Sequence, residues 1–338
     1  MSATIRDLAK HCGLSVSAVS KALNGYTDIS EETRKAVEEA ARALDYHPNA
    51  HARALKAGCS YNIGVLFADD SQSGLTHPFF SQVLENFKRE AEAAGYDITF
   101  ISHRMGSGRV TYLDHCRYRH VDGVCIACVD FDSEEVRRLI ESDLPVVTID
   151  RIFEGRDSVC SDNADGIRRL TEYVYKKGHR RVAYIHGPRS AVTDERVNSF
   201  RETAARLGLD IPKGYMPQCE YINPVSAYKA AMKLLRLQER PTCVLVSDDY
   251  SAIGVIQAIG EAGLSIPGDI SVAGYDGINQ MQHFSPRLTT VRQDTAALGR
   301  ESARQLISLI EKTAENTPRR VVVPSEMITG QTVADIRE

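Results

Sequence analysis

Closely spaced cysteines, histidines and glycines are the parts of this sequence where chemistry would first be sought. Cys125 and Cys128 have the Cys-x-x-Cys spacing of metal and redox sites, but they fall in an apolar run expected to be a strand, where residues i and i+3 point to opposite faces. His47 and His51 flank a proline and do not form a ligand pair on one helix. Gly106–Gly108 lacks the third glycine of a dinucleotide-binding loop, and the sequence has neither a phosphate-loop nor a serine-hydrolase signature. We therefore expect no catalytic residue, no metal and no cofactor.

The polar residues near the N-terminus mark the ends of three short helices. We expect Thr4 to cap a helix through Cys12, and Gly13 to break the chain before Ser15 caps a second helix through Leu23. Ser30 would cap a third helix, from Glu31 to about Asp45. A helix, a glycine turn and a second helix fit a helix-turn-helix, whose second helix enters the major groove of DNA. That helix would expose Val16, Ser17, Ser20 and Lys21. The alternative is a small helical cap with a polar face.

After Ser60 the sequence alternates between short apolar runs and longer helical patterns, which indicates parallel sheets with crossover helices. The expected strands are 63–67, 98–101, 123–128, 146–149, 181–186, 215–219, 243–247 and 270–274. The expected helices lie near 79–94, 110–119, 133–142, 194–208, 224–236 and 250–262. The fold class is therefore α/β. Two similar lobes would follow the helical headpiece, with a ligand cleft at the carboxyl ends of their strands.

Composition excludes several other classes of protein. The chain has 338 residues, 41 Lys plus Arg, 45 Asp plus Glu and a net charge of -4, which is typical of a soluble protein of two or three domains. No apolar stretch is long enough to cross a membrane, and the N-terminus lacks the apolar segment of a signal peptide. We expect a cytoplasmic protein with reduced cysteines and no membrane partner.

Several motifs closely resemble the LacI/GalR family of bacterial transcription regulators. In the N-terminal region the matching segments are Thr4–Ala9, Gly13–Ser15, Ala18–Gly25, Ser30–Arg34, Tyr46–Asn49 and Ala52–Leu55. In the remainder they are Pro78–Phe80, Val121–Gly123, Gly178–Arg180, Arg240–Thr242, Asp249 and Gly274–Asp276. The resemblance covers nearly the whole chain. It implies a helix-turn-helix headpiece and a two-lobed domain resembling the periplasmic binding proteins.

The resemblance assigns roles in DNA binding to individual residues. Val16, Ser17 and Lys21 fall at base-reading positions, where Lys21 would reach guanine O6 and N7. Asn49 to Lys56 corresponds to a hinge helix, in which Leu55 would wedge into the minor groove and Ala52 must stay small. Eight residues hold no helix alone in water, so this segment would fold only on DNA. The residues assigned to DNA binding are Thr4, Ser15, Val16, Ser17, Ser20, Lys21, Asn24, Ser30, Tyr46, Asn49, Ala52, Arg53 and Leu55.

The same resemblance places an effector between the two lobes. Phe79 and Phe80 would stack on the ligand, Arg196 would grip its hydroxyls, and Asp249 and Asp276 would accept hydrogen bonds from it. Asp150, Arg151, Asp162 and Ile222 are weaker candidates on neighbouring loops. Each main residue has an ordinary alternative. Phe79 would then be core, Arg196 would pair with Asp194 or Glu195, and Asp276 would cap a short helix beginning at Gly277. Asp70, Gln72 and His77 belong to a loop that either adds to the ligand site or is simply solvated.

The implied organisation has three parts. Residues 1–47 form the helix-turn-helix domain, 48–60 the hinge and linker, and 61–338 the effector-binding and dimerisation domain. The N-subdomain would comprise about 61–161 and 292–321 and the C-subdomain about 162–291 and 322–338, with crossings near 161, 291 and 322.

The function implied is that of a homodimeric repressor of a palindromic operator, controlled by a small effector. An acid and arginine pair beside a stacking ring favours a sugar or sugar derivative over a purine. The alternatives are a two-lobed sugar-binding protein without regulatory DNA binding, a purine-responsive regulator, and an α/β enzyme with a helical N-terminal domain.

Overall fold

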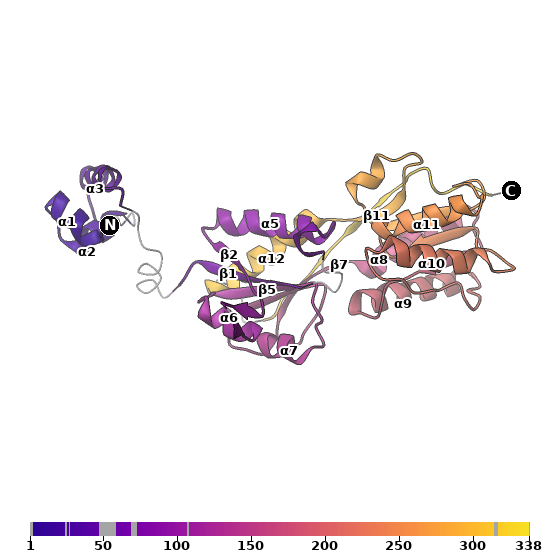
Figure 1. Ribbon diagram of the computed structural model, residues 1–338, viewed down its shortest axis with the longest axis horizontal. Helices are drawn as coiled ribbons and strands as arrows, with labels where there is room; N and C mark the ends of the chain where they lie inside the picture. Colours follow the sequence, from indigo (N-terminus) through magenta and orange to yellow (C-terminus); the bar gives the residue numbers. More distant parts are fainter. Residues whose placement is uncertain are drawn as a thin grey trace. The chain divides into compact units, whose positions relative to one another are not determined.

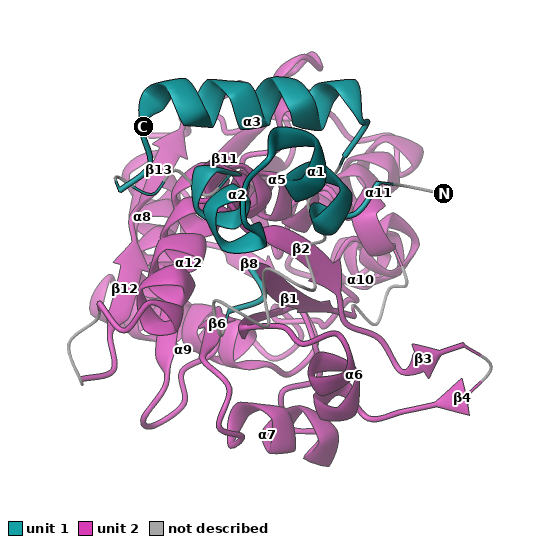
Figure 2. Cartoon of the chain, turned by 90° about the vertical axis from the view of Figure 1, so that its left-hand side faces the viewer, with its two compact units in different colours: residues 1–61 teal, residues 62–338 magenta. Residues whose placement is uncertain are grey.

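The computed structural model describes residues 3–23, 26, 28–46, 59–68, 73–106, 108–313 and 317–337. The chain divides into two compact units, Met1–Tyr61 and Asn62–Glu338, which Figure 2 colours separately. Within the described residues, no helix has the length and apolar character needed to cross a membrane.

The first unit contains a headpiece of three helices, α1 (Ile5–Cys12), α2 (Val16–Leu23) and α3 (Glu31–Ala43). Thr4 and Ser30 cap α1 and α3 with their side chains, and Gly13 ends α1 in the left-handed conformation with φ 64°. Apolar residues from all three helices form its core, with Leu8, Val19 and Val37 fully buried. The three helices expected from the caps are thus confirmed.

The second unit begins with a lobe built on a six-stranded sheet, which we call the N-lobe. Its strands, in sheet order, are β12 (Arg320–Val323), β7 (Asp157–Ser161), β6 (Val146–Ile149), β5 (Gly123–Ala127), β1 (Asn62–Phe67) and β2 (Asp97–Phe100). All neighbouring pairs are parallel. The associated helices are α5 (Phe80–Ala93), α6 (Tyr112–Tyr118), α7 (Glu134–Ile140) and α12 (Thr295–Ile310). Helices α5 and α12 lie side by side although they are far apart in sequence (Figure 1).

A short turn and a small hairpin complete the N-lobe. The 3-10 turn η1 (Gly74–Thr76) precedes α5, and strands β3 (Arg104–Met105) and β4 (Gly108–Arg109) pair in antiparallel fashion after β2.

The other lobe, the C-lobe, has a five-stranded sheet. In sheet order its strands are β13 (Ser325–Ile328), β11 (Thr289–Gln293), β10 (Ser271–Asp276), β9 (Cys243–Val246) and β8 (Val182–Ile185). Only β13 runs antiparallel to its neighbour. The helices are α8 (Asn163–Lys176), α9 (Ala191–Arg206), α10 (Pro224–Leu235) and α11 (Asp249–Glu261), with the 3-10 turn η2 (Asn279–Gln282). The α/β fold with a helical N-terminal headpiece is confirmed.

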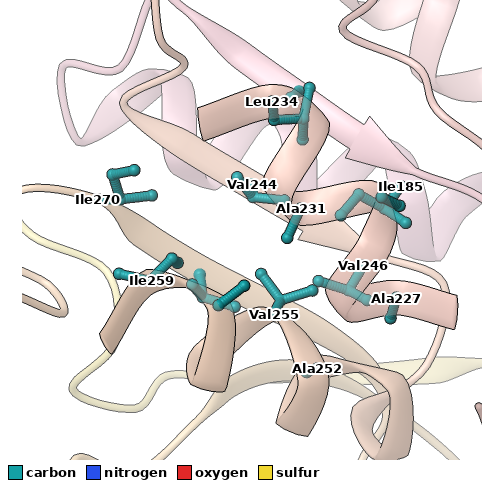
Figure 3. Close-up of a cluster of buried hydrophobic side chains, with 14 of the residues drawn as sticks. Ile185, Ala227, Ala231, Leu234, Val244, Val246, Ala252, Val255, Ile259 and Ile270 are labelled. Carbon is teal, nitrogen blue, oxygen red and sulfur yellow. The ribbon is translucent and has the colours of Figure 1, made fainter. Parts of the chain in front are cut away.

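The C-lobe core lies on both faces of this sheet. Figure 3 shows Ala231 and Leu234 of α10 and Val255 and Ile259 of α11 packed against the sheet residue Val244. Residues of α8 and α9, including the buried Leu170 and Phe200, cover the opposite face. Helix α11 approaches α10 closely at Gly254, where an added Cβ would lie 1.8 Å from the carbonyl oxygen of Pro224.

The chain passes between the two lobes three times, each time through one residue. Asp162 joins β7 to α8, Asp294 joins β11 to α12, and Pro324 joins β12 to β13. The strands β7 and β12 leave the N-lobe sheet side by side, in parallel register. Because these links are so short, the carboxyl ends of the N-lobe strands β7 and β12 lie next to the first residues of C-lobe elements.

One expected strand is wrong, and several elements were not anticipated. Residues 215–219 form no regular strand: they run beside the end of β8 with three backbone hydrogen bonds, to Tyr184 and His186, and one isolated bridge, from Gln218 to His186. Pro217 offers no backbone N–H and therefore interrupts a hydrogen-bonded ladder at this point. Helices α8 and α12 and strands β7, β11, β12 and β13 lie at the lobe crossings and were not identified as elements from the apolar pattern.

Candidate DNA-binding surface and effector site

Helix α2 exposes the side chains that were expected to meet DNA. Val16 is 43% exposed, and Ser17 is exposed beside it, whereas Ser20 is partly buried and Val19 and Ala22 face the headpiece core. The Ser15 hydroxyl accepts a hydrogen bond from the backbone N–H of Ala18 at 3.1 Å and so begins the helix. Backbone N–H groups at such a helix start are ready donors to a phosphate.

Lys21 is not a free cation in this headpiece. Its Nζ forms an ion pair with the carboxylate of Asp28, although both side chains are substantially exposed. Tyr46 packs against the headpiece core and is half-buried. The remaining candidates Asn24, Asn49, Ala52, Arg53 and Leu55 lie outside the described residues.

In the two lobes, the effector candidates gather at the carboxyl ends of strands. Asp150 follows β6 and Asp276 ends β10. Both have left-handed backbones, with φ 60° at Asp150 and φ 100° at Asp276, and Ile222 has φ 52°. Residues with side chains rarely adopt this conformation, and such strain is concentrated at functional sites.

Arg196 is the centre of the group. It lies on α9 and is only 4% exposed. Its Nε donates to Oδ1 of Asn163 at 2.8 Å and its Nη1 donates to the carbonyl oxygen of Ser247 at 3.0 Å. Its guanidinium lies 3.8 Å from the centre of the Tyr275 ring. Nη2 makes no hydrogen bond with the described residues, so a held guanidinium keeps one donor group available. The expected alternative, a pair with Asp194 or Glu195, is not formed.

Asp276 and Asp150 are the two carboxylates whose pKa values respond most clearly to this arginine. Burial raises the pKa of Asp276 to about 7, Arg196 opposes the rise, and Asp248 and Asp150 add to it. Burial also raises the pKa of Asp150, against a hydrogen bond from the Ser161 N–H and the charge of Arg196. Asp150 belongs to the N-lobe and Arg196 to the C-lobe. The charges of the two lobes therefore act on one another at this site.

Two other acidic candidates are occupied within the protein. Asp249 is fully buried and accepts hydrogen bonds from Thr290 Oγ1 at 2.6 Å and from the Ile278 N–H at 2.8 Å. It therefore holds β11 and the chain before η2. Asp162 accepts from the Asp165 N–H at 3.0 Å and caps α8 at a lobe crossing.

The aromatic and second basic candidates lie in the N-lobe. Phe79 and Phe80 are 6% and 9% exposed, and their rings meet edge to face at 5.0 Å. Phe80 also contacts the Phe67 ring, so both rings are already covered by protein. Arg151 forms a 3.4 Å ion pair with Asp132.

The last candidate, Ile222, belongs to the C-lobe. It donates its N–H to Asp248 at 3.3 Å.

Sequence reasoning missed four residues that shape the site. Asn163 and Ser247 hold Arg196, and Gln293 Nε2 donates to Asp276 Oδ1 at 2.7 Å. Tyr221 lies flat on Gly187, where an added Cβ would be 2.3 Å from its ring. Its hydroxyl is 2.8 Å from Thr193 Oγ1. Tyr221 adjoins the candidate Ile222 in sequence, which is a weak signal. The residues before Gln293 are Thr289, Thr290, Val291 and Arg292, so no apolar run pointed to Gln293. Within the described residues, no group of three metal-ligating side chains occurs.

A capped helix-turn-helix and a two-lobed parallel α/β domain with a polar site at its strand ends define a ligand-controlled DNA-binding regulator. Known proteins agree with this class. Residues 4–49 match the bacterial regulatory proteins of the lacI family, and residues 171–333 match the periplasmic binding protein-like domain. The HTH-type transcriptional repressor PurR of Photorhabdus laumondii is 31% identical over 98% of this chain and 97% of its own. The chain therefore belongs to the LacI family of bacterial regulatory proteins, as its motifs had indicated.

Solved structures extend the similarity to the whole fold. The lac repressor dimer bound to operator and the anti-inducer ONPF superposes with a TM-score of 0.84 at 26% identity, covering 99% of this chain and 100% of that one. The transcriptional regulator CelR in complex with cellobiose gives 0.72 at 25% identity, covering 98% and 99%. The chain is thus a transcriptional repressor of this family with an effector-binding domain.

Proposed function

We propose that this repressor acts as a homodimer on a palindromic operator in the cytoplasm, catalyses no reaction, and releases or grips DNA according to a sugar bound between its lobes. The observation that carries the sugar assignment is Arg196, whose Nε and Nη1 are held while Nη2 makes no hydrogen bond with the described residues. Beside it stands Asp276 as an acceptor. A fixed arginine donor next to a carboxylate is suited to a ligand with many hydroxyl groups.

Two structural neighbours are described with a sugar, whereas the 31% identical PurR repressors are described without one. CelR is described in complex with cellobiose, and a LacI family regulator from Enterococcus faecium, 23% identical with a TM-score of 0.69, is described with bound ribose. The latter likeness concerns the fold alone. The effector residues we assign to this chain are Arg196 and Asp276, with Asp150 and Ile222 on neighbouring loops.

For DNA, the proposal keeps the roles expected from the sequence. Val16, Ser17 and Lys21 would read base edges, while Ser15, Ser20, Ser30, Tyr46 and Thr4 would hold the headpiece on the phosphates. Asn49, Ala52, Arg53 and Leu55 would act in the minor groove. A single headpiece is nearly neutral, so two headpieces on a palindrome are needed for strong binding.

The C-lobe offers an apolar face for the second copy. Val225, Tyr250, Ile253 and Phe284 are 64%, 41%, 38% and 63% exposed. They come from the starts of α10 and α11 and from the chain after η2. These segments meet because Pro224 contacts Gly254 and Ile278 donates to Asp249. A shared apolar face of this kind marks a protein interface. The lac repressor structure is described as a dimer.

Selection of binding sites from a random DNA pool tests this function. The full chain should enrich a palindrome with a central CG step, and one sugar from a panel of sugars and purines should change its affinity for that site. Arg196→Lys is the matched variant. It keeps the positive charge but loses the fixed, two-sided donor geometry, and should bind the same palindrome without responding to the sugar. If only a purine releases the DNA, the effector is a purine and not a sugar. If the selection enriches no sequence, operator binding is rejected.

A further inference from the structure

The groups around Arg196 carry an excess of negative charge. Asp150 and Asp276 both feel its charge, Glu195 acts on Asp150, and Asp248 acts on Asp276. One guanidinium therefore interacts with two carboxylates, those of Asp150 and Asp276. Because Asp150 and Asp276 are partly removed from water, their charges are screened less than those of exposed groups. A ligand with its own negative charge would be repelled by this group.

The polar atoms of the site that have no partner among the described residues are mostly hydrogen-bond acceptors. Asp276 uses Oδ1 for Gln293, and Asp150 uses Oδ1 for the Ser161 N–H. No described residue donates to the Oδ2 atoms of these two carboxylates. On the donor side, Nη2 of Arg196 is left without a partner among the described residues. The site thus presents more acceptors than donors.

Gln293 provides an independent sign that this site is suited to a ligand with donor groups. This side chain is 5% exposed, and its Oε1 has no hydrogen-bond partner in the part of the chain that the structure describes. Its Nε2 is bound to Asp276, so the unpartnered oxygen lies in the same amide that contacts the site carboxylate. A buried acceptor without a partner is destabilising and is rare in native proteins. A donor from a ligand would satisfy it.

We infer that the effector is a donor-rich molecule without negative charge, a neutral sugar or its amine-bearing form, and that sugar acids and sugar phosphates are excluded. The inference rests on the proposed function. Hydroxyl and ammonium groups supply the donors that Asp276, Asp150 and Gln293 lack. Carboxylates and phosphates supply only acceptors, and where Asp276 is ionised, above its pKa of about 7, Arg196 is the donor left to bind them. Leaving buried polar groups unpaired is what makes discrimination of this kind strong.

Matched sets of sugars test the charge selection directly. Each set contains a sugar, its amino form, its acid and its phosphate, for example glucose, glucosamine, gluconate and glucose 6-phosphate, with equivalent sets for galactose and ribose. Binding to the full chain is measured by calorimetry, and release of the selected operator is measured in parallel. Within the responding set, we expect the acid and the phosphate to bind at least about 100-fold more weakly than the parent sugar.

Variants locate the selection in the named residues. Gln293→Leu removes the unpartnered acceptor and should weaken the responding sugar by about 10-fold or more, whereas Gln257→Leu, an exposed glutamine on α11, should not. The double variant Asp150→Asn with Asp276→Asn removes two negative charges. It should narrow the preference for the neutral sugar over its acid by at least about 10-fold. The ratio of the affinity for the neutral sugar to the affinity for its acid remains informative even if both affinities fall.

Each outcome of the binding and release measurements either supports or overturns the inference. Response to a neutral or amine-bearing sugar without response to its acid and phosphate supports the inference. An acid or phosphate that binds as well as the parent sugar overturns the charge selection but leaves a sugar-controlled repressor in place. Operator binding that no sugar alters overturns the sugar assignment itself, and the inference with it.

Discussion

Arg196 is positioned before any ligand arrives. Asn163 and the Ser247 carbonyl fix two of its nitrogens, and the Tyr275 ring supports its plane. A donor fixed in this way loses little conformational entropy when a ligand binds. The backbone strain at Asp150 and Asp276 has a matching interpretation, since it places both carboxyl groups at the strand ends. The residues of the site are thus organised by the fold.

Asp276 should make stability depend on pH. Its pKa is raised by burial to about 7 in the folded chain, above its ordinary value of 3.8. The folded state therefore holds this proton more tightly, and the associated stability is lost as pH rises from about 4 to above 7. Asp276→Asn removes that loss. Relative to the natural chain, its free energy of unfolding should rise by about 1–3 kcal/mol between pH 5 and pH 8.

Urea denaturation across this pH range measures the difference. Asp210→Asn, an exposed change of the same charge, should leave the pH profile unaltered. Parallel profiles for Asp276→Asn and the natural chain would show that Asp276 is already ionised in the folded state at pH 5.

The ion pair between Lys21 and Asp28 should restrain DNA binding. A lysine that must leave a carboxylate to reach a base or phosphate binds DNA less well than a free one. Asp28→Asn should therefore raise operator affinity by about 2- to 5-fold at low salt, an effect typical of a weak exposed pair. Glu38→Gln makes the same charge change on the exposed side of α3 and is the control. Operator affinity is measured by fluorescence anisotropy. An equal increase in affinity in both variants would mean that the change in net charge, and not the loss of the ion pair, causes it.

At the scale of elements, helix starts were the best-predicted features. Thr4, Ser15 and Ser30 each accept a backbone hydrogen bond near the expected position because N-cap chemistry is local. The strand expected over residues 215–219 failed because prolines and Gly214 interrupt an otherwise apolar run. Helices α8 and α12 were missed because each begins one residue after a strand ends, which apolar periodicity alone does not reveal.

The crossing of α10 and α11 should depend on one glycine. An alanine at Gly254 would place its Cβ 1.8 Å from the Pro224 carbonyl oxygen, so the two helices must separate. We expect Gly254→Ala to lower the free energy of unfolding by about 2 kcal/mol or more. Gly260 lies on the same helix with no atom within 4 Å of an added Cβ. Gly260→Ala should instead stabilise the chain, by about 0.5 kcal/mol. Equal effects in thermal denaturation would mean that the helices adjust freely.

For the whole molecule, DNA affinity should depend on association of two chains. Ile253→Glu places a charge in the apolar face formed by Val225, Tyr250 and Phe284. We expect monomers in sedimentation equilibrium and at least about 100-fold weaker operator binding, because one headpiece makes half of the contacts. Ile336→Glu changes a similarly exposed isoleucine, 42% against 38%, and should leave both properties intact. A dimer that persists in Ile253→Glu would place the interface elsewhere.

The proposed effector site was only partly predictable from the sequence. Arg196 and Asp276 were chosen because they match family motifs, and Asp150 was a weaker candidate on a neighbouring loop. Their partners Asn163, Ser247 and Gln293 come from three separate segments that only the folded lobes bring together. Asp249 matches the same motifs, but its oxygens bind Thr290 and Ile278. Sequence similarity alone does not distinguish such a structural carboxylate from a ligand-binding one.

The measurement that tests the central claim most directly is the affinity of the active sugar for the dimer with and without operator. If sugar and operator act on one equilibrium between two arrangements of the lobes, the operator must change sugar affinity by the same factor by which the sugar changes operator affinity. We expect matching factors of about 5- to 150-fold, determined by calorimetry and by anisotropy. Equal sugar affinities for free and operator-bound protein would contradict control of DNA binding from this site.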